Sequence, residues 1–415
     1  MVQKSIIIFL TTLTLTACST DKQFSDGFKQ KNIEETQNST SSNKQPIEYS
    51  QQNQIEKTQK SASSNKQAIE SSESDKIEET QKPKEEIQIK ASPKQNKKPV
   101  KIQSFVKWCK QKNTLPEETK YTVELLLKEA GTQDCKQANQ TLSKLTELDL
   151  SEKRISDIQP IANLTNLTYI SLTKNKISDI RALANLTNLT HIILDINNIE
   201  DITPLADLTN LIKIDLQDNK ISYIKPLSGL TNLTILNLGE NQISDIQPLA
   251  NLTKLEYLNL VENKISDIEP IAKLYSLAYL NLGINQIIDI KPLSNLYNID
   301  FLILWKNNIS DIEPLSNLIN LQNLSLQDNQ ISDIKPLSSL RKLSQANLSQ
   351  NKITKIDSIS NLTNLYGLSL AENNISDIKP LSSLKKLDVL YLEKNPIKDK
   401  TCPMKPKKPN SVCKL

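Results

Sequence analysis

Residues 233–254 read LTILNLGENQISDIQPLANLTK, and this phrase recurs along most of the chain. Its asparagine belongs to a series spaced 22 residues apart: Asn175, Asn197, Asn219, Asn241, Asn263, Asn285, Asn307, Asn329, Asn351, Asn373 and Asn395. Lys153 fills the same position in an earlier copy, which makes twelve repeats over residues 145–397. A fixed period of this length is typical of a solenoid in which every coil contributes one short strand.

The repeated leucines and isoleucines must point inward, because a single coil cannot bury them and stacked neighbours can. The repeated asparagine lies among these apolar residues. A buried amide is costly unless it is hydrogen-bonded. We therefore expect each asparagine to bond backbone groups of its own coil and the next, as an asparagine ladder.

A second polar column carries aspartate, and Tyr223 and Lys355 interrupt it. Its members are Asp157, Asp179, Asp201, Asp245, Asp267, Asp289, Asp311, Asp333, Asp377 and Asp399. Most precede Ile-x-Pro-Leu, so we expect each carboxylate to accept a backbone N–H bond at the start of a helical or 3₁₀ turn. The alternative is a calcium ladder of stacked carboxylates. One carboxylate per coil and the lack of a D-x-D-x-D loop disfavour it.

The phrase L-x-x-L-x-L-x-x-N-x-I-x-D-I-x-P-L-x-x-L-T-N is similar to the 22-residue leucine-rich repeats of the internalin family, over residues 145–397. The resemblance implies an α/β repeat solenoid, a right-handed curved horseshoe or rod with a parallel sheet on the concave face and 3₁₀ turns on the convex face. It also implies non-catalytic binding of a protein through concave side chains. The LPxTG signal of wall-anchored internalins does not appear. The plan resembles envelope leucine-rich-repeat lipoproteins of cyanobacterial type more closely.

The first residues indicate export. Lys4 precedes an apolar run, and Leu15-Thr16-Ala17-Cys18 resembles the lipobox of bacterial lipoproteins. We expect a signal peptide over residues 1–17, acylation of Cys18 with diacylglycerol and palmitate, and a place in the bacterial cell envelope, at the outer membrane or the cell surface. An ordinary signal peptide with a chance cysteine is the alternative. Residues 18–100, rich in Gln, Asn, Ser, Lys and Glu, predict a disordered linker.

Four more cysteines lie in two pairs at the two ends of the repeats. Four cysteines allow three pairings, but a rigid rod separates the two ends. The reachable disulfides are Cys109–Cys135 and Cys402–Cys413. Residues 101–144 predict a helical N-terminal cap, in which Thr114 and Glu117 have capping-box spacing. Residues 398–415 predict a C-terminal cap.

Alternate residues of a strand face opposite ways, so the variable positions beside the inward leucines line the concave face. Aromatic residues are few, yet several gather on three successive strands. We call this group the aromatic patch: Tyr257, Val261, Tyr279, Phe301, Ile303 and Trp305. Exposed aromatic clusters mark interfaces, so we expect this patch to bind protein. The alternative is that the large side chains cover one another. A weaker secondary patch comprises Tyr169, His191, Ile193 and Ile196.

Nothing in the sequence favours an enzyme, a cofactor or a metal. His191 is the only histidine, so a zinc site or a nucleophile–base pair is not available. Asp195 and Asp215 can pair across strands, but an open solenoid offers no desolvated cleft for glycoside hydrolysis. The net charge of +4 is small and dispersed, which disfavours nucleic acid. The sequence predicts a monomeric, non-enzymatic, protein-binding envelope lipoprotein. The alternative is a structural or carbohydrate-contacting component that acts through its linker.

Overall fold

The computed structural model describes residues 103–399, 401–403 and 411–415. The expected signal peptide, Cys18 and the expected linker therefore lie outside the described residues. Among the described residues, no helix is long and apolar enough to cross a membrane.

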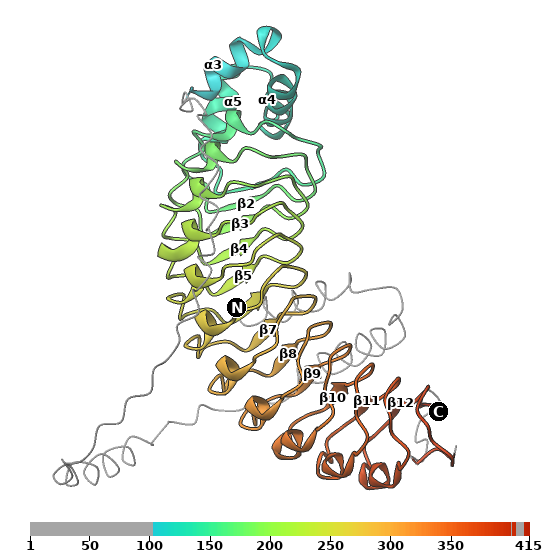
Figure 1. Cartoon of the computed structure of the whole chain (residues 1–415). Helices are drawn as coiled ribbons and strands as arrows, with labels where there is room; N and C mark the ends of the chain where they lie inside the picture. The colour runs from blue at the N-terminus through green and yellow to red at the C-terminus, as the bar shows by residue number, and fades with distance from the viewer. Residues whose placement is uncertain (1–102, 400, 404–410) are drawn as a thin grey trace, which may run out of the picture. The chain divides into compact units, whose positions relative to one another are not determined.

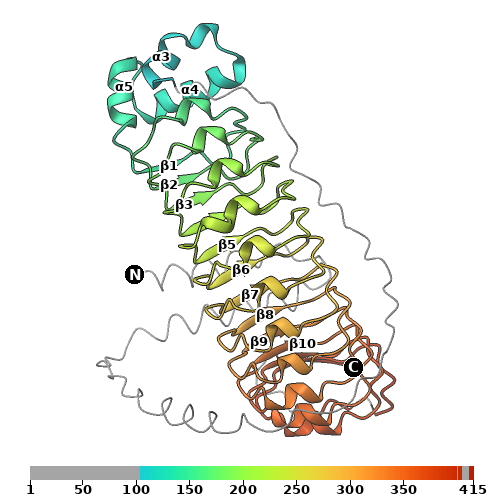
Figure 2. The same cartoon turned by 60° about the vertical axis from the view of Figure 1, so that its left-hand side comes forward.

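The repeats stack as coils, and each coil adds one three-residue strand to a single sheet (Figures 1 and 2). The strands are β1 (Glu147–Asp149), β2 (Tyr169–Ser171), β3 (His191–Ile193), β4 (Lys213–Asp215), β5 (Ile235–Asn237), β6 (Tyr257–Asn259), β7 (Tyr279–Asn281), β8 (Phe301–Ile303), β9 (Asn323–Ser325), β10 (Gln345–Asn347), β11 (Gly367–Ser369) and β12 (Val389–Tyr391). All neighbours pair in parallel, in chain order and in register with the 22-residue period, as at Tyr257↔Tyr279.

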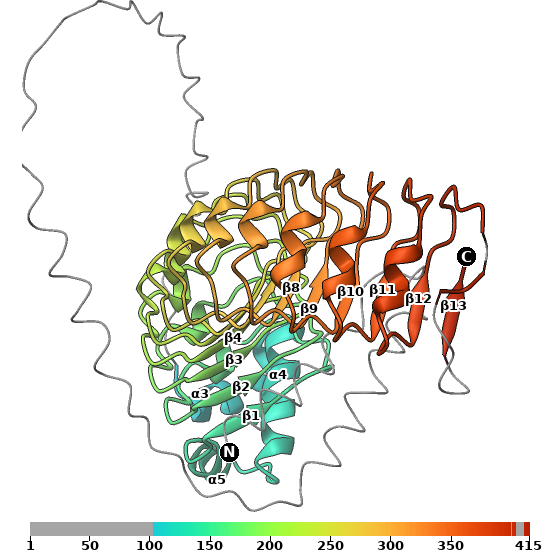
Figure 3. The same ribbon diagram turned by 90° about the horizontal axis from the view of Figure 1, so that it is seen from below.

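One 3₁₀ turn follows each strand from β1 to β11, on the side of the coil away from the sheet (Figure 3). These turns are η3 (Gln159–Ile161), η4 (Arg181–Leu183), η5 (Thr203–Leu205), η6 (Lys225–Gly229), η7 (Gln247–Leu249), η8 (Glu269–Ile271), η9 (Lys291–Leu293), η10 (Glu313–Leu315), η11 (Lys335–Ser339), η12 (Asp357–Asn361) and η13 (Lys379–Ser383). The prediction of a parallel-sheet solenoid with 3₁₀ turns is confirmed.

The aspartate column starts these turns, as predicted. In the repeat quoted first, Asp245 Oδ1 accepts the backbone N–H of Gln247, the first residue of η7, at 2.8 Å. The same bond forms at all ten aspartates of the column. One oxygen of each carboxylate is thus already committed to the backbone.

The asparagine ladder is confirmed, but it joins each coil to the preceding one rather than the next. Asn241 Nδ2 donates to the carbonyl of Leu238 in its own coil and to that of Leu216 one coil earlier, at 3.1 and 3.0 Å. Its Oδ1 accepts the N–H of Ile221 at 2.9 Å. The leucines and isoleucines around it are almost fully buried, so the ladder satisfies backbone groups that water cannot reach.

A second ladder, which was not expected from the sequence, runs along one side of the solenoid. It lies in the turns between each 3₁₀ turn and the next strand, which we call the edge turns. Asn188 Nδ2 donates to the carbonyl of Thr165 at 2.9 Å, and Asn232 repeats this bond to Thr209 at 3.0 Å. The Thr-Asn pair that ends the repeat phrase therefore has a structural role.

Helices cap the first coil. They are α3 (Phe105–Lys110), α4 (Glu117–Glu129) and α5 (Cys135–Leu142), with a short 3₁₀ turn, η2 (Lys112–Thr114), between the first two. The predicted disulfide between Cys109 and Cys135 joins α3 to α5. The Thr122 hydroxyl on α4 donates to the carbonyl of Asp157 at 2.7 Å, which fixes α4 to the first repeat.

One detail of the cap differs from the prediction. The expected capping box is absent, because Pro116 is the N-cap of α4 and no side chain caps it. The Thr114 hydroxyl instead donates to the carbonyl of Gln111 in the preceding turn.

The C-terminal segment adds a thirteenth strand, β13 (Val412–Lys414), which pairs in parallel with β12. The predicted Cys402–Cys413 disulfide holds this strand in place. The Lys414 ammonium lies 5.2 Å from the centroid of the Tyr391 ring, within range of a cation–π contact.

Each repeat turns sharply just before its ladder residue, through a left-handed backbone conformation. The residue before the ladder position has a positive φ in every copy, between 50° and 60°, and none of these residues is glycine. Most are polar or charged. Two are isoleucines, Ile196 and Ile284, with φ of 55° and 50°. A β-branched side chain is strained in this conformation.

Candidate functional site

The aromatic patch is centred on a stack of three rings on adjacent strands. Tyr257, Tyr279 and Phe301 are the first residues of β6, β7 and β8 and are paired in register. The rings of Tyr257 and Tyr279 are nearly parallel with centroids 4.3 Å apart, and Tyr279 and Phe301 follow at 5.1 Å. Strand spacing in a parallel sheet matches the spacing of stacked rings, so the sheet itself imposes this arrangement.

The expectation that all these aromatics are exposed is wrong for two of them. Tyr257 and Tyr279 are each only 7% exposed. Stacking covers the faces of each ring with its neighbours. Burial raises the pKa of Tyr279 to about 12, against the lowering effect of hydrogen bonds with Tyr257 and Asn281. Both tyrosines therefore support the patch from within.

The part of the aromatic patch that reaches solvent lies mainly in the repeat of β8. Phe301, Ile303 and Trp305 are all half-buried and come from alternate positions of this repeat. The Trp305 indole lies directly over Gly283 of the preceding repeat, so close that a Cβ atom on residue 283 would collide with the indole nitrogen. Gly283 thus provides the space that the indole occupies, because any larger residue would displace it.

Val261 shows the same arrangement two repeats before Trp305. Its Cγ1 would lie 2.9 Å from a Cβ at Gly239, so Val261 also leans over a glycine of the preceding repeat. Two of the six glycines of the chain therefore make room for members of the aromatic patch. These glycines were missed at the level of sequence, although their place among larger residues in the same column was readable.

Ile284 is a further residue that was missed in the sequence. It follows Gly283, is half-buried, and its N–H donates to the carbonyl of Trp305 at 2.8 Å. Equivalent positions of neighbouring repeats carry Glu262 and Lys306, both exposed. A strained isoleucine in a column of charged residues extends the apolar surface beside Trp305.

The secondary patch is less continuous. Tyr169 and His191 are half-buried, with ring centroids 6.4 Å apart and tilted planes. Ile193 is buried at 8% exposure, whereas Ile196 is 43% exposed. Burial, with a smaller contribution from the charge of Lys213, lowers the pKa of His191. The imidazole is therefore neutral at neutral pH.

Two carboxylates lie next to this secondary patch. Asp215 is 5% exposed, and burial followed by the charge of Asp195 raises its pKa to about 6. The pKa of Asp195 is also raised by burial, although its Oδ1 accepts a 2.6 Å hydrogen bond from the Thr173 hydroxyl. Burial lowers the pKa of Lys213, which lies between the two in sequence. These groups form a desolvated polar cluster on the strand face.

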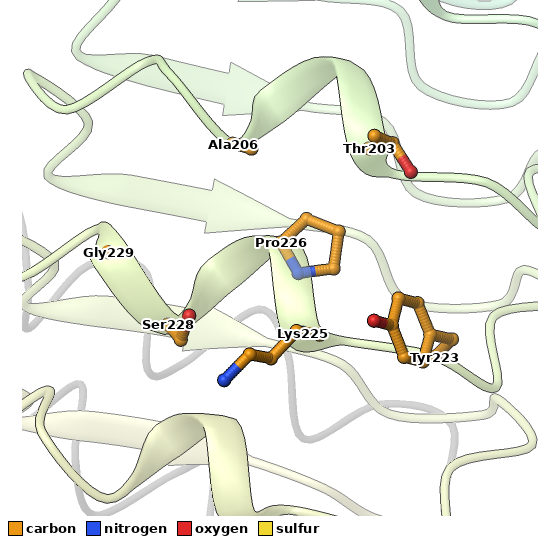
Figure 4. Close-up of a pocket in the computed structure, with 7 residues that line it drawn as sticks. All are labelled: Thr203, Ala206, Tyr223, Lys225, Pro226, Ser228 and Gly229. Carbon is orange, nitrogen blue, oxygen red and sulfur yellow. The ribbon is translucent and has the colours of Figure 1, made fainter. Parts of the chain in front are cut away.

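A depression in the surface lies elsewhere, on the convex face. It has a volume of about 510 Å³ between η5 and η6 and is open to solvent. Figure 4 shows its lining: Thr203, Ala206, Tyr223, Lys225, Pro226, Ser228 and Gly229. Tyr223 and Lys225 are the two titratable residues of this lining, and no carboxylate or histidine accompanies them. Among the described residues, no group of three or more His, Cys, Asp or Glu is placed to hold a metal.

The repeats and their geometry match known proteins. A family model described as leucine-rich repeats in two copies matches residues 143–185, 165–207, 209–251, 253–295 and 297–339. The crystal structure of an internalin, InlF of Listeria monocytogenes, is 37% identical over 63% of this chain and 84% of its own, with a TM-score of 0.56. The chain belongs to the leucine-rich-repeat family.

Two further structures resemble this leucine-rich-repeat protein. The functional domain of InlJ from Listeria monocytogenes is 28% identical, with a TM-score of 0.56, and covers 63% of the chain. The chain spans 56% of that domain. A leucine-rich-repeat protein of Leptospira interrogans is 27% identical, with a TM-score of 0.53, over 62% of this chain and 80% of its own. No curated protein matches the chain.

The expected internalin-like architecture is thereby confirmed. Leucine-rich-repeat domains of this kind are typically non-enzymatic modules for protein interaction.

Proposed function

We propose that this leucine-rich-repeat protein binds a protein ligand on the strand face, at the part of the aromatic patch formed by Phe301, Ile303 and Trp305. The observation that carries the proposal is the support beneath these residues. The buried tyrosine stack fixes Phe301, and Gly283 makes room for Trp305. Interface hot spots are enriched in such immobilised aromatic side chains, because little entropy is lost when a partner covers them.

Charged residues line one side of the surface formed by Phe301, Ile303 and Trp305. The positions that precede the ladder asparagines have a positive φ, and three of them next to Trp305 carry exposed charged residues: Glu262, Lys306 and Asp328. A polar rim around an apolar centre is the usual anatomy of a protein interface. The rim carries both signs of charge, which favours a protein ligand over a polyanion such as nucleic acid.

A photoreactive amino acid at position 303, followed by cross-linking on intact cells and mass spectrometry, will identify the ligand. The matched control places the same amino acid at Ile288, an isoleucine that is 66% exposed on another face. The proposal predicts a protein adduct at 303 that is absent at 288. Identical adducts at both positions would mean that the strand face is not selective.

The first quantitative prediction concerns Trp305→Ala. With the cross-linked ligand, this variant should lose about 2 kcal/mol of binding free energy, roughly 30-fold in Kd. Ile288→Ser should leave Kd unchanged, and both variants should keep the wild-type circular dichroism. Wild-type affinity of the Trp305 variant would contradict the proposed site.

We further propose that the protein is a monomer tethered to the bacterial envelope through acylated Cys18, at the outer membrane or the cell surface. The lipobox-like Leu15-Thr16-Ala17-Cys18 supports this proposal. Cells labelled with an alkyne analogue of palmitate should incorporate it into the wild-type chain and not into Cys18→Ser. Equal labelling of the variant would rule out Cys18 as the acylated residue.

The second candidate function assigns the activity to the linker, as a structural or carbohydrate-contacting segment. Its support is the length and polar composition of residues 18–100. A chain that lacks residues 19–100 but keeps Cys18 separates the two. Ligand capture should persist if the strand face binds, and should disappear if the linker does.

A further inference from the structure

A different face of the solenoid carries an exposed apolar stripe. Tyr275, Tyr297 and Ile319 occupy the same position in the edge turns of three successive repeats and are 54%, 48% and 56% exposed. Six other repeats have threonine there: Thr165, Thr187, Thr209, Thr231, Thr253 and Thr363. Three large apolar side chains thus replace a small polar one, and only in consecutive coils.

The backbone holds this stripe in a line. Asn298 Nδ2 donates to the carbonyl of Tyr275 at 2.7 Å, and Asn320 Nδ2 donates to that of Tyr297 at 2.8 Å. These bonds belong to the edge ladder, so the turns remain in register although their side chains differ. The three side chains therefore project from equivalent places along one side of the stack.

Basic residues border the stripe on both sides. Lys254 precedes it, and Arg341 and Lys342 follow it in the next repeat. Lys254 and Lys342 replace the ladder asparagine, and each ammonium donates to the amide oxygen of the asparagine one coil earlier, at 2.8 and 2.7 Å. These acceptors are neutral amides, so neither contact neutralises the positive charge of its lysine.

The edge turns of the C-terminal half are positively charged as a whole. Residues 250–256, 272–278, 294–300, 316–322, 338–344, 360–366 and 382–388 contain six Lys or Arg and three Asp or Glu, a formal charge of +3. One of the three acids, Asp388, is 6% exposed and accepts a hydrogen bond from the Ser411 hydroxyl. The first four edge turns carry threonine–asparagine pairs and contain neither lysine nor arginine.

We propose that this edge of the solenoid rests on an anionic lipid surface. Tyrosine favours the boundary between headgroups and acyl chains, and isoleucine favours the acyl chains themselves. Lysine and arginine beside them reach the lipid phosphates, to which anionic headgroups attract them. The stripe and its basic borders therefore match the layers of a membrane interface.

A protein ligand fits this edge less well than a bilayer does. Lys254 on one border of the apolar stripe, Arg341 and Lys342 on the other, and the formal charge of +3 on the edge turns of this half together match an anionic headgroup layer. The proposed lipid contact lies on another face than the aromatic patch and does not depend on acylation. It therefore goes beyond the proposed function.

Vesicle sedimentation tests the proposal with the full chain carrying Cys18→Ser, so that no acyl anchor contributes. The wild-type edge should bind vesicles that contain phosphatidylglycerol and not vesicles of phosphatidylcholine alone, and high salt should weaken binding. Tyr275→Thr, Tyr297→Thr and Ile319→Thr together should weaken it at least about tenfold. Because threonine stands at this position in six other repeats, the variant should fold normally, which a thermal melt checks.

Two controls make the result specific. Ile288→Ser removes an isoleucine that is 66% exposed from another face and should not change vesicle binding. Arg341→Thr with Lys342→Asn recreates the Thr363-Asn364 pair of the following repeat and should weaken binding to anionic vesicles. Unchanged binding of the triple threonine variant overturns the proposal. So does binding to soluble dextran sulfate that equals vesicle binding and survives the triple substitution, which would identify a site for polyanions.

Discussion

At the scale of single residues, Asp215 is a carboxylate that the strand face buries to 5% exposure. Its pKa of about 6 in the folded state exceeds the usual 3.8 of an aspartate. A raised pKa means that the folded chain holds this proton more tightly than the unfolded chain does. The stabilisation that this proton provides is complete below about pH 3.8 and is lost as the pH rises through about 6.

Asp215→Asn should therefore stabilise the fold at neutral pH. Asparagine occupies the same strand position in the next three repeats, where Asn259 Nδ2 donates to Asn237 Oδ1 at 2.9 Å. We expect a gain of roughly 1–3 kcal/mol in the free energy of unfolding at pH 7.5, shrinking to nothing at about pH 3.5. Urea unfolding at the two pH values measures it. A gain that is equal at both would show that charge is not the cause.

Ile284 leads to a prediction of the same kind for backbone strain. Its φ of 50° is unfavourable for a β-branched side chain, whereas asparagine adopts it readily. Ile284→Asn should raise the free energy of unfolding by about 0.5–1.5 kcal/mol and weaken binding at the aromatic patch. Glu262→Asn, with φ of 54° but no β-branch, is the control and should gain less. Destabilisation by Ile284→Asn would mean that its apolar contacts outweigh its strain.

The burial of the stacked rings is the residue-level feature that the sequence did not reveal. The position of Tyr257, Tyr279 and Phe301 on the strand face could be read from the period. Their burial could not, because it depends on ring orientation, and parallel stacking covers a tyrosine that an isolated strand would expose. The sequence offered a sign only for Trp305, because Gly283 in the same column of the preceding repeat leaves room for its indole.

At the scale of elements, most of the fold follows from the repeat itself. Strand positions, 3₁₀ turns, aspartate caps and the inner asparagine ladder all repeat with the period, so one coil predicts the others. The edge ladder escaped prediction although it repeats with the same period, whereas β13 has no repeated pattern. β13 comes from a segment that matches no repeat and becomes a strand only because β12 offers an open edge.

The two asparagine ladders should differ strongly in energy. Asn241→Ala leaves buried backbone groups of Leu216, Leu238 and Ile221 without their partner and should cost about 2–4 kcal/mol. Asn188→Ala removes one exposed bond to Thr165 and should cost roughly 0.5–1.5 kcal/mol. Urea midpoints at constant m-value give both numbers. Equal costs would show that burial does not set the strength of the ladder.

At the scale of the whole molecule, each coil touches only its neighbours, so stability is a sum of local interfaces and the ends open first. The two disulfides lie at these ends. Cys402→Ser with Cys413→Ser should release β13, with a loss of about 2–4 kcal/mol that is local to the C-terminal coils. Hydrogen exchange should accelerate in β13 and β12 and decline toward β8, while β1 to β6 stay protected. The matched double variant at Cys109 and Cys135 should produce the mirror pattern, opening α3, α5 and β1 first. Uniform acceleration across all strands in either variant would mean that the solenoid unfolds as one cooperative unit, and that its ends do not limit its stability.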